Sequence, residues 1–457
     1  MWASVLERFE RDAPTSVMAH LALERALPPG WIDEVFEAHR ERQYARELLF
    51  STTVELMALV SLGLRPSLHA AARGAPELPV SLAALYGKVN RTEPAVLRAL
   101  VRGGTERLAP VVAAVGQGAA EGACLPGWEV RVLDGNHLPA SEKRLAPLRD
   151  LRGAALPGHT LVAYDPDAGL VVDIIPAEDA YQSERVSALP LLADARAGQA
   201  WIVDRHFCTA DLLGGWQAAG AGFVAREHAR HPRLAEEGGW RACGRVETGE
   251  VREQTIVAEG QAAAWRRVEL ALDAPTEAGE RAIRLWTNLP EEVDAGRIAR
   301  LYRARWTVEG MFQRLENVLR SEIAGLAHPR AALLGFAVAA LAHNVLTLIQ
   351  RCVERAHRAE GQPAPKVSTY HLAWQIRGGY GGMLIALPPE HRPSCVEADP
   401  APLAERLMHL ARRVDLRQVV ASKRGPKIHK PKPYIDGAAA RAHVSTARIL
   451  AQAKARP

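Results

Sequence analysis

The feature that most constrains the fold of this chain is a change in hydrophobic period near residue 126. Before it, apolar residues recur at helical spacing, as in 54–60 and 95–101. After it, short apolar runs alternate with polar turns, as strands do, at 128–134, 159–164, 170–175 and 200–204. We therefore expect an all-helical region first, followed by a core built on a sheet.

The order of the elements after the change is informative. A first strand ends at Asp134, a hairpin turns at 165–169, a helix covers 183–196, and a buried strand ends at Asp204. Strand, hairpin, helix, strand is the opening order of the ribonuclease-H-like fold, in which the first and fourth strands lie side by side. This α/β arrangement predicts that the two aspartates meet at one edge of the sheet.

The 457 residues are enough for about two to three domains. Further strands separated by polar turns follow the second aspartate, so we expect an insertion before a long helix at 297–326. The expected domains are a helical N-terminal DNA-binding region at 1–125, a catalytic core at 126–204 and 297–350, a β-rich insertion at 205–296, and a helical C-terminal region with a basic tail at 351–457.

Two segments point to nucleic acid without establishing it. Residues 81–95 have the pattern helix, turn, helix, which DNA-binding proteins use and which is also common in other helical domains. The tail holds eight Lys or Arg residues between Arg412 and Lys432 against one acid, Asp415. Such tails are either phosphate-contacting arms or solvated ends, and a net charge of only +5 does not decide between these interpretations.

The cysteines and one long apolar stretch indicate the cellular compartment. The five cysteines lie far apart and form no CxxC pair, which favours a reducing environment over a disulfide framework. Residues 331–349 are nearly long enough to cross a bilayer, but they carry His343 and Asn344 near their centre. Burying those groups in lipid is costly, so we expect a core helix of a cytoplasmic protein that does not enter a membrane.

A third carboxylate, Glu309, lies on the expected helix at 297–326. Tyr302, Arg305, Glu309, Gln313 and Glu316 share one face of that helix at spacings of three and four. A solvent-facing stripe with an Arg305–Glu309 salt bridge is one interpretation. The other is that Glu309 joins the two aspartates around a pair of divalent cations, for which carboxylate oxygens are the preferred ligands.

Several segments resemble the bacterial insertion-sequence DDE transposases with the YREK signature (insertion sequence family four). Tyr302, Arg305 and Glu309 match the Tyr-x2-Arg-x3-Glu part of that signature. The segments Asp134-Gly-Asn and Asp204-Arg-His-Phe are similar to the family's two aspartate motifs, and a β-rich insertion between the second Asp and the Glu is typical of it. The resemblance covers roughly residues 45–350.

The resemblance implies a DNA cleavage and strand-transfer enzyme that uses two Mg²⁺ ions, or Mn²⁺, held by Asp134, Asp204 and Glu309. It also implies a bacterial, nucleoid-associated protein that acts as a homodimer on terminal inverted repeats and target DNA. The residues expected to contact DNA are Tyr302, Arg305, Trp306, Lys423, Arg424, Lys427, Lys430 and Lys432. In related enzymes aromatics of the insertion hold a flipped base, and here the insertion contains Trp240, Trp265 and Trp286.

The signature is incomplete at one position. Its Lys, expected seven residues after the glutamate, is Glu316 here, which places an acid where a phosphate-contacting cation is expected; Arg314 and Arg320 are nearby candidates to replace it. Three functions therefore remain open: an active transposase, a transposase-derived DNA-binding repressor, and a metal-dependent nuclease without strand transfer.

Overall fold

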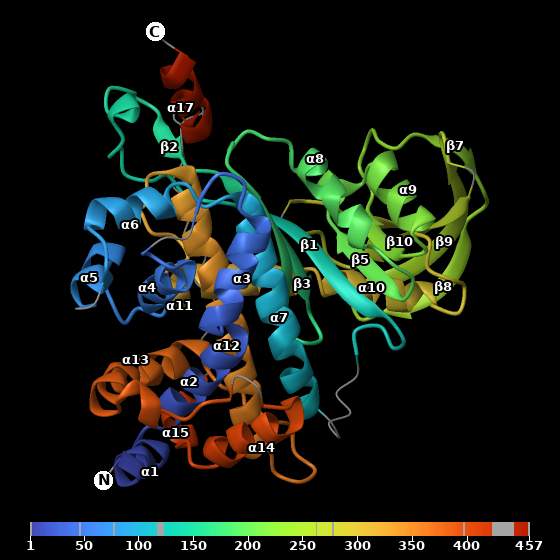
Figure 1. Cartoon of the computed structure of the whole chain (residues 1–457). Helices are drawn as coiled ribbons and strands as arrows, with labels where there is room; N and C mark the ends of the chain where they lie inside the picture. The colour runs from blue at the N-terminus through green and yellow to red at the C-terminus, as the bar shows by residue number, and fades with distance from the viewer. Residues whose placement is uncertain are drawn as a thin grey trace.

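The computed structural model describes residues 2–44, 47–75, 78–116, 123–261, 263–276, 278–395, 398–422 and 443–455. Helices gather on one side of the molecule and a long twisted sheet extends to the other (Figure 1). The expected basic residues Lys423, Arg424, Lys427, Lys430 and Lys432 lie outside the described residues.

The N-terminal region is helical, as its 3.6-residue period predicts. Its elements are α1 (Trp2–Asp12), α2 (Pro14–Ala26), α3 (Pro29–His39), α4 (Phe50–Ser61), α5 (Leu68–Arg73), α6 (Leu82–Val89) and α7 (Pro94–Gly116). The expected helix, turn, helix at 81–95 is confirmed: the Ser81 hydroxyl accepts the Ala84 N–H at the start of α6, and α7 begins at Pro94.

The central sheet has ten strands. They are β1 (Glu129–His137), β3 (His159–Asp165), β4 (Leu170–Ala177), β5 (Gln199–Val203), β6 (Gly222–Arg226), β7 (Leu234–Glu237), β8 (Arg241–Val246), β9 (Gly249–Ala258), β10 (Ala264–Leu272) and β11 (Ala282–Thr287). Their order is β4-β3-β1-β5-β6-β11-β10-β9-β7, with β8 paired to β9. The strands expected to form a separate insertion at 205–296 instead continue the same sheet, because β6 pairs with β5 on one side and with β11 on the other.

The expected hairpin and the neighbouring first and fourth strands are confirmed. Strands β3 and β4 are antiparallel, and β1 runs parallel to β5 from Glu129 opposite Gln199 to Leu133 opposite Val203. The prediction that the first strand ends at Asp134 is wrong, because β1 stays paired to β3 as far as His137. Asp134 therefore lies at the point where only the pairing with β5 stops.

Side chains alternate between the two faces of the sheet. Val132 and Ile202 pack with the helical body, whereas Leu133 and Trp201 pack in a second cluster on the opposite face. That opposite face is covered by α8 (Glu184–Ala188), η2 (Leu189–Asp194) and α9 (Ala210–Ala218). The expected helix at 183–196 is thus present as one α-helical turn continued by a 3₁₀ segment.

After β11 the described chain is mainly helical, with α10 (Ala295–Arg303), α11 (Trp306–Leu319), α12 (Pro329–Ala356), α13 (Thr369–Ala386), α14 (Pro400–Ala411), α15 (Leu416–Val419) and α17 (Thr446–Ala455). The single long helix expected at 297–326 is instead α10 and α11, with a break at Ala304 and Arg305. A short strand, β12 (His443–Ser445), pairs in parallel with β2 (Ala154–Leu156), a contact between segments far apart in sequence.

Helix α12 is the one described helix that is long and apolar enough to cross a membrane, and 94% of its apolar window is buried inside the protein. It packs against α2, α4, α7, α14 and strand β4. His343 and Asn344 are fully buried within it. The expectation of a core helix is therefore confirmed.

Candidate active site at the ends of β1 and β5

Asp134 and Asp204 come from adjacent strands. Their predecessors Leu133 and Val203 are paired across β1 and β5, and neighbouring strands lie about 4.8 Å apart, so the two aspartates emerge side by side. Asp134 accepts the N–H of Gly135 at 2.9 Å. Asp204 follows the last residue of β5 and accepts the N–H of His206 at 2.7 Å, at the start of a short 3₁₀ turn, η3 (Arg205–Phe207).

Glu309 reaches the same place from the first turn of α11. Arg305, immediately before α11, connects the two sides: its guanidinium lies 3.2 Å from a carboxylate oxygen of Asp134 and 3.0 Å from one of Glu309. The guanidinium nitrogens are about 2.3 Å apart, so the two contacted oxygens lie within about 9 Å of each other. Arg305 thus joins two carboxylates, one of which is 171 positions away from it in sequence.

The electrostatics of Asp134 reflect this crowding. The pKa of its carboxyl is raised to about 6, mainly by burial and also by the negative charges of Asp204 and Glu309, while Arg305 and the Gly135 N–H oppose the shift. Three carboxylates around one guanidinium leave an excess of negative charge. A carboxylate that is costly to ionise, close to two others, is a group that an additional cation would stabilise.

The residues fit a divalent cation by the chemistry of their donors, since all three supply hard oxygen ligands. Within the described part of the chain, however, no three His, Cys, Asp or Glu groups are close enough together to hold one metal ion. Arg305 lies between Asp134 and Glu309 instead. Binding of metal by Asp134, Asp204 and Glu309 thus requires the guanidinium to move from this position.

Tyr302 and Trp306 flank Arg305 on opposite sides of the helix break. The Tyr302 side chain is buried, and burial raises the pKa of its hydroxyl, against the effect of the Arg305 charge. Trp306 is 60% exposed, and its ring centroid lies 5.0 Å from the guanidinium carbon of Arg305. An exposed tryptophan beside a carboxylate site is available to stack on a base or to lie along a DNA backbone.

The other candidate side chains lie elsewhere. Glu316 is exposed on α11, and its charge adds to the burial that raises the pKa of Glu322. Arg314 approaches the Tyr164 hydroxyl at 3.5 Å, and Arg320 donates to the carbonyl of Arg65, so neither replaces the missing Lys beside the carboxylates.

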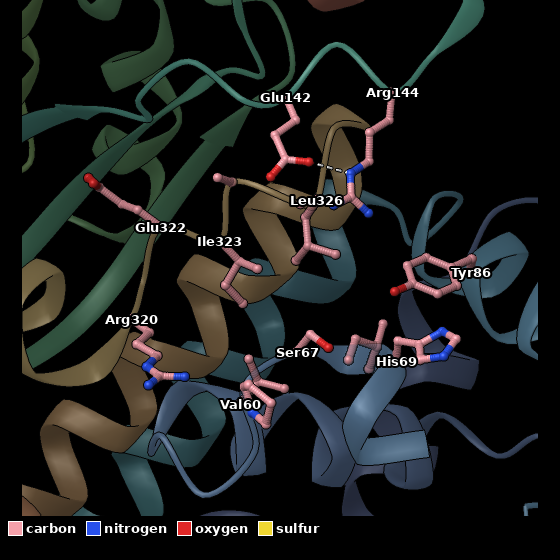
Figure 2. Close-up of a pocket in the computed structure, with 14 residues that line it drawn as sticks. Val60, Ser67, His69, Tyr86, Glu142, Arg144, Arg320, Glu322, Ile323 and Leu326 are labelled. Carbon is pink, nitrogen blue, oxygen red and sulfur yellow. Dashed lines mark hydrogen bonds and ion pairs between the residues drawn. The ribbon is translucent and has the colours of Figure 1, made fainter. Parts of the chain in front are cut away.

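Figure 2 shows the cavity that Arg320 borders, between the N-terminal helices and the segment before α12. It encloses about 360 Å³, and the three carboxylates are not among its lining residues. Its Arg144 is paired with Glu142 at 2.5 Å. The charges of this cavity are partly satisfied internally, and it is separate from the candidate active site.

The tryptophans of the β-rich segment divide into two kinds. Trp265 and Trp286 are each 1% exposed and pack together in the core, so they are not placed to hold a base. Trp240 is 37% exposed and lies under the guanidinium of Arg252, with the ring centroid 4.5 Å away. Only Trp240 of the three has a surface that a ligand can reach.

One residue beside the site was not expected from the sequence. Glu184, the first residue of α8, lies 3.5 Å from His137 and 3.6 Å from His206, the histidines that follow the two aspartates. In sequence Glu184 follows a Ser at a helix start, where acidic residues are common, so its pattern gave no signal.

Comparison with known proteins identifies a transposase domain in this chain. Residues 129–345 match the family model described as the transposase DDE domain. The matched region contains Asp134, Asp204 and Glu309, together with all the strands of the large sheet. No curated protein matches the chain at a significant level. The match supports a DDE transposase.

Proposed function

We propose that this protein, with its transposase DDE domain, cuts the ends of a bacterial insertion sequence and joins them to target DNA. The observation that carries the proposal is the meeting of Asp134, Asp204 and Glu309 around Arg305. The strand order β4-β3-β1-β5-β6 supports a ribonuclease-H-like core for this reaction. The Tyr302, Arg305, Glu309 spacing supports placement among the YREK transposases.

In this proposal Asp134, Asp204 and Glu309 hold two Mg²⁺ ions, or Mn²⁺. When bound, such ions lower the pKa of the attacking hydroxyl and neutralise the leaving oxygen. The positively charged side chain of Arg305 would then bind the DNA and not the carboxylates. Arg305, displaced from the carboxylates, is within reach of a scissile phosphate, to which a guanidinium donates two parallel hydrogen bonds. Tyr302 is buried and lies close enough to Arg305 for the guanidinium charge to act on its hydroxyl.

DNA contacts outside the carboxylates complete the proposal. Trp306 is exposed beside the site, and the helix, turn, helix of α6 and α7 offers a separate contact for the terminal repeats. The basic residues 423–432 are proposed to follow the DNA backbone. Two copies are proposed to pair the two ends of the element, in the cytoplasm and on the bacterial nucleoid.

The test uses DNA that carries the sequences bordering the gene. Purified protein with Mg²⁺ is expected to cut at the junction between element and flank, and to join pre-cut ends to a plasmid. Cutting without joined product indicates a metal-dependent nuclease. Binding without cutting indicates a repressor, and either result contradicts the proposal.

A further inference from the structure

Glu184 occupies a position between the two aspartate motifs. Its carboxylate oxygens face two different imidazoles, Nδ1 of His137 at 3.5 Å and Nε2 of His206 at 3.6 Å. His137 follows Asp134 by three residues on β1, and His206 follows Asp204 by two residues after β5. Each strand end therefore presents one aspartate and one histidine, and a single carboxylate from α8 contacts both histidines.

The packing around Glu184 also explains Gly135. A Cβ atom at Gly135 would lie 2.3 Å from Oε1 of Glu184, closer than real contacts allow. The φ angle of Gly135 is not positive, so its backbone conformation does not itself require glycine. Its N–H is the one that holds Asp134. The Glu184 carboxylate thus packs directly on the peptide that positions Asp134.

Helix α8 holds the loop after β5 by a second contact. Arg185 donates from Nε to the backbone carbonyl of His206 at 2.7 Å, and the backbone N–H of His206 donates to the Asp204 carboxylate. The side chain of Glu184 is 18% exposed, against 57% for His137 and 45% for His206. The two histidines are accessible at the surface, and the carboxylate behind them is largely covered.

We propose that Glu184 is a positioning residue of the carboxylate site, holding through His137 and His206 the end of β1 that carries Asp134 and the turn after β5 that carries Asp204. The proposal rests on the proposed function for its consequence in catalysis. Contacts between half-exposed groups contribute little to folding stability. Their effect on the reaction rate is larger, because the segments that carry the proposed metal ligands must stay within about 0.5 Å of the productive geometry.

The experiment compares Glu184→Ala, Gly135→Ala and the double variant. Loss of a residue that supports metal-binding side chains typically costs ~10- to 100-fold in activity, and we expect each single variant to cut DNA slower by that factor. The added methyl group at position 135 displaces the Glu184 carboxylate, whereas the Glu184→Ala substitution leaves room for that methyl group. The double variant should therefore be no slower than the slower single variant.

Glu184→Gln keeps the shape and one acceptor, so we expect partial recovery of the cutting rate relative to Glu184→Ala. Affinity for the element ends and the melting temperature should stay at wild-type values in all these variants. Glu405→Gln, a charge loss on the exposed side of α14, is the matched control and should change nothing. A wild-type cutting rate in Glu184→Ala, or losses that multiply in the double variant, would overturn the proposal.

A second readout does not depend on cutting. In spectra of protein labelled at the histidine Cε1 carbons, Glu184→Ala and Gly135→Ala should both move the signals of His137 and His206, and Glu405→Gln should not. Unmoved signals contradict the arrangement itself. If the wild-type protein cuts no DNA but the two variants show these shifts, the proposed function is contradicted and the Glu184 contacts are established.

Discussion

Two polar sites in this molecule are built in opposite ways. In the helical body, Asn344 of α12 is fully buried and makes three hydrogen bonds of 2.8 Å, two with the backbone of Val171 and one with Thr105. Val171 belongs to β4, the edge strand of the sheet. The amide side chain thus closes an edge that would otherwise present unpaired backbone groups.

The ends of β1 and β5 show the contrasting design. Asp134 and Glu309 share one guanidinium, and Asp204 lies close enough to raise the pKa of Asp134. The neutral groups of Asn344, Val171 and Thr105 are matched donor to acceptor, whereas the three carboxylates exceed the positive charge of Arg305. This difference distinguishes Asn344, which stabilises the fold, from the three carboxylates, whose excess negative charge a bound cation would neutralise.

The largest expected effect comes from breaking the charged region. Asp204→Asn removes one carboxylate of the proposed metal site, and we expect DNA cutting to fall on the order of 10³-fold or more. Binding to element ends and the melting temperature should hardly change, because Asp204 contributes one local backbone contact. Gel assays of cutting and binding measure both. Asp150→Asn, which changes an exposed carboxylate outside the three proposed ligands, is the control; persistent cutting by Asp204→Asn contradicts the site.

Breaking the neutral region should have the reverse effect. Asn344→Ala leaves the backbone groups of Val171 and the Thr105 hydroxyl without their buried partner, which costs on the order of 2–4 kcal/mol of folding stability. The rate of DNA cutting per folded molecule should stay at the wild-type value. Denaturant unfolding measures the first quantity, and cutting at low temperature measures the second. A stable variant with lost activity would show that the two regions are not independent.

Low pH should destabilise the helical body through His343, which burial keeps neutral. Burial, with a smaller contribution from the charge of Arg314, lowers its pKa to about 3, whereas in the unfolded chain the pKa is about 6.5. Between these values the unfolded chain binds a proton that the folded protein excludes. Stability is therefore lost progressively as pH falls below about 6.5. Urea unfolding at pH 7 and pH 5 should show a smaller loss for His343→Gln than for the wild-type protein.

The smallest effect is expected from Glu316→Lys, which restores the signature cation. Glu316 is exposed and lies two helical turns from Glu309, so no packing changes. We expect tighter DNA binding, with the slope of log affinity against log salt steeper by about one, and a few-fold change in cutting. If only the Lys variant cuts, the natural chain is a disabled transposase that binds DNA.

Sequence patterns predicted the parts of this fold that local chemistry determines. Apolar runs ending in Asp134 and Asp204, with a hairpin and a helix between them, predicted the parallel neighbours β1 and β5. The spacing of Arg305 and Glu309 predicted their contact, because i and i+4 residues share a helix face. The contact between Arg305 and Asp134 depends on how α11 packs on the sheet, which no local pattern contains.

Other features were out of reach for the same reason. Strand β12 has three residues and pairs with an equally short partner from a distant part of the chain, so neither segment has a strand period. The break between α10 and α11 occurs without Pro or Gly, at Ala304 and Arg305. Glu184 acquires its two histidine contacts only after α8 docks across both strand ends. Each of these depends on tertiary packing.

The central claim is that carboxylates from three distant segments bind divalent cations together. The most direct measurement replaces Mg²⁺ with Fe²⁺ and uses the hydroxyl radicals made at the bound iron to cut the nearby backbone. The account predicts cuts close to 134, 204 and 309, suppressed by added Mg²⁺ and lost in Asp204→Asn. Cuts that avoid these three segments, or that persist unchanged with excess Mg²⁺, would contradict it.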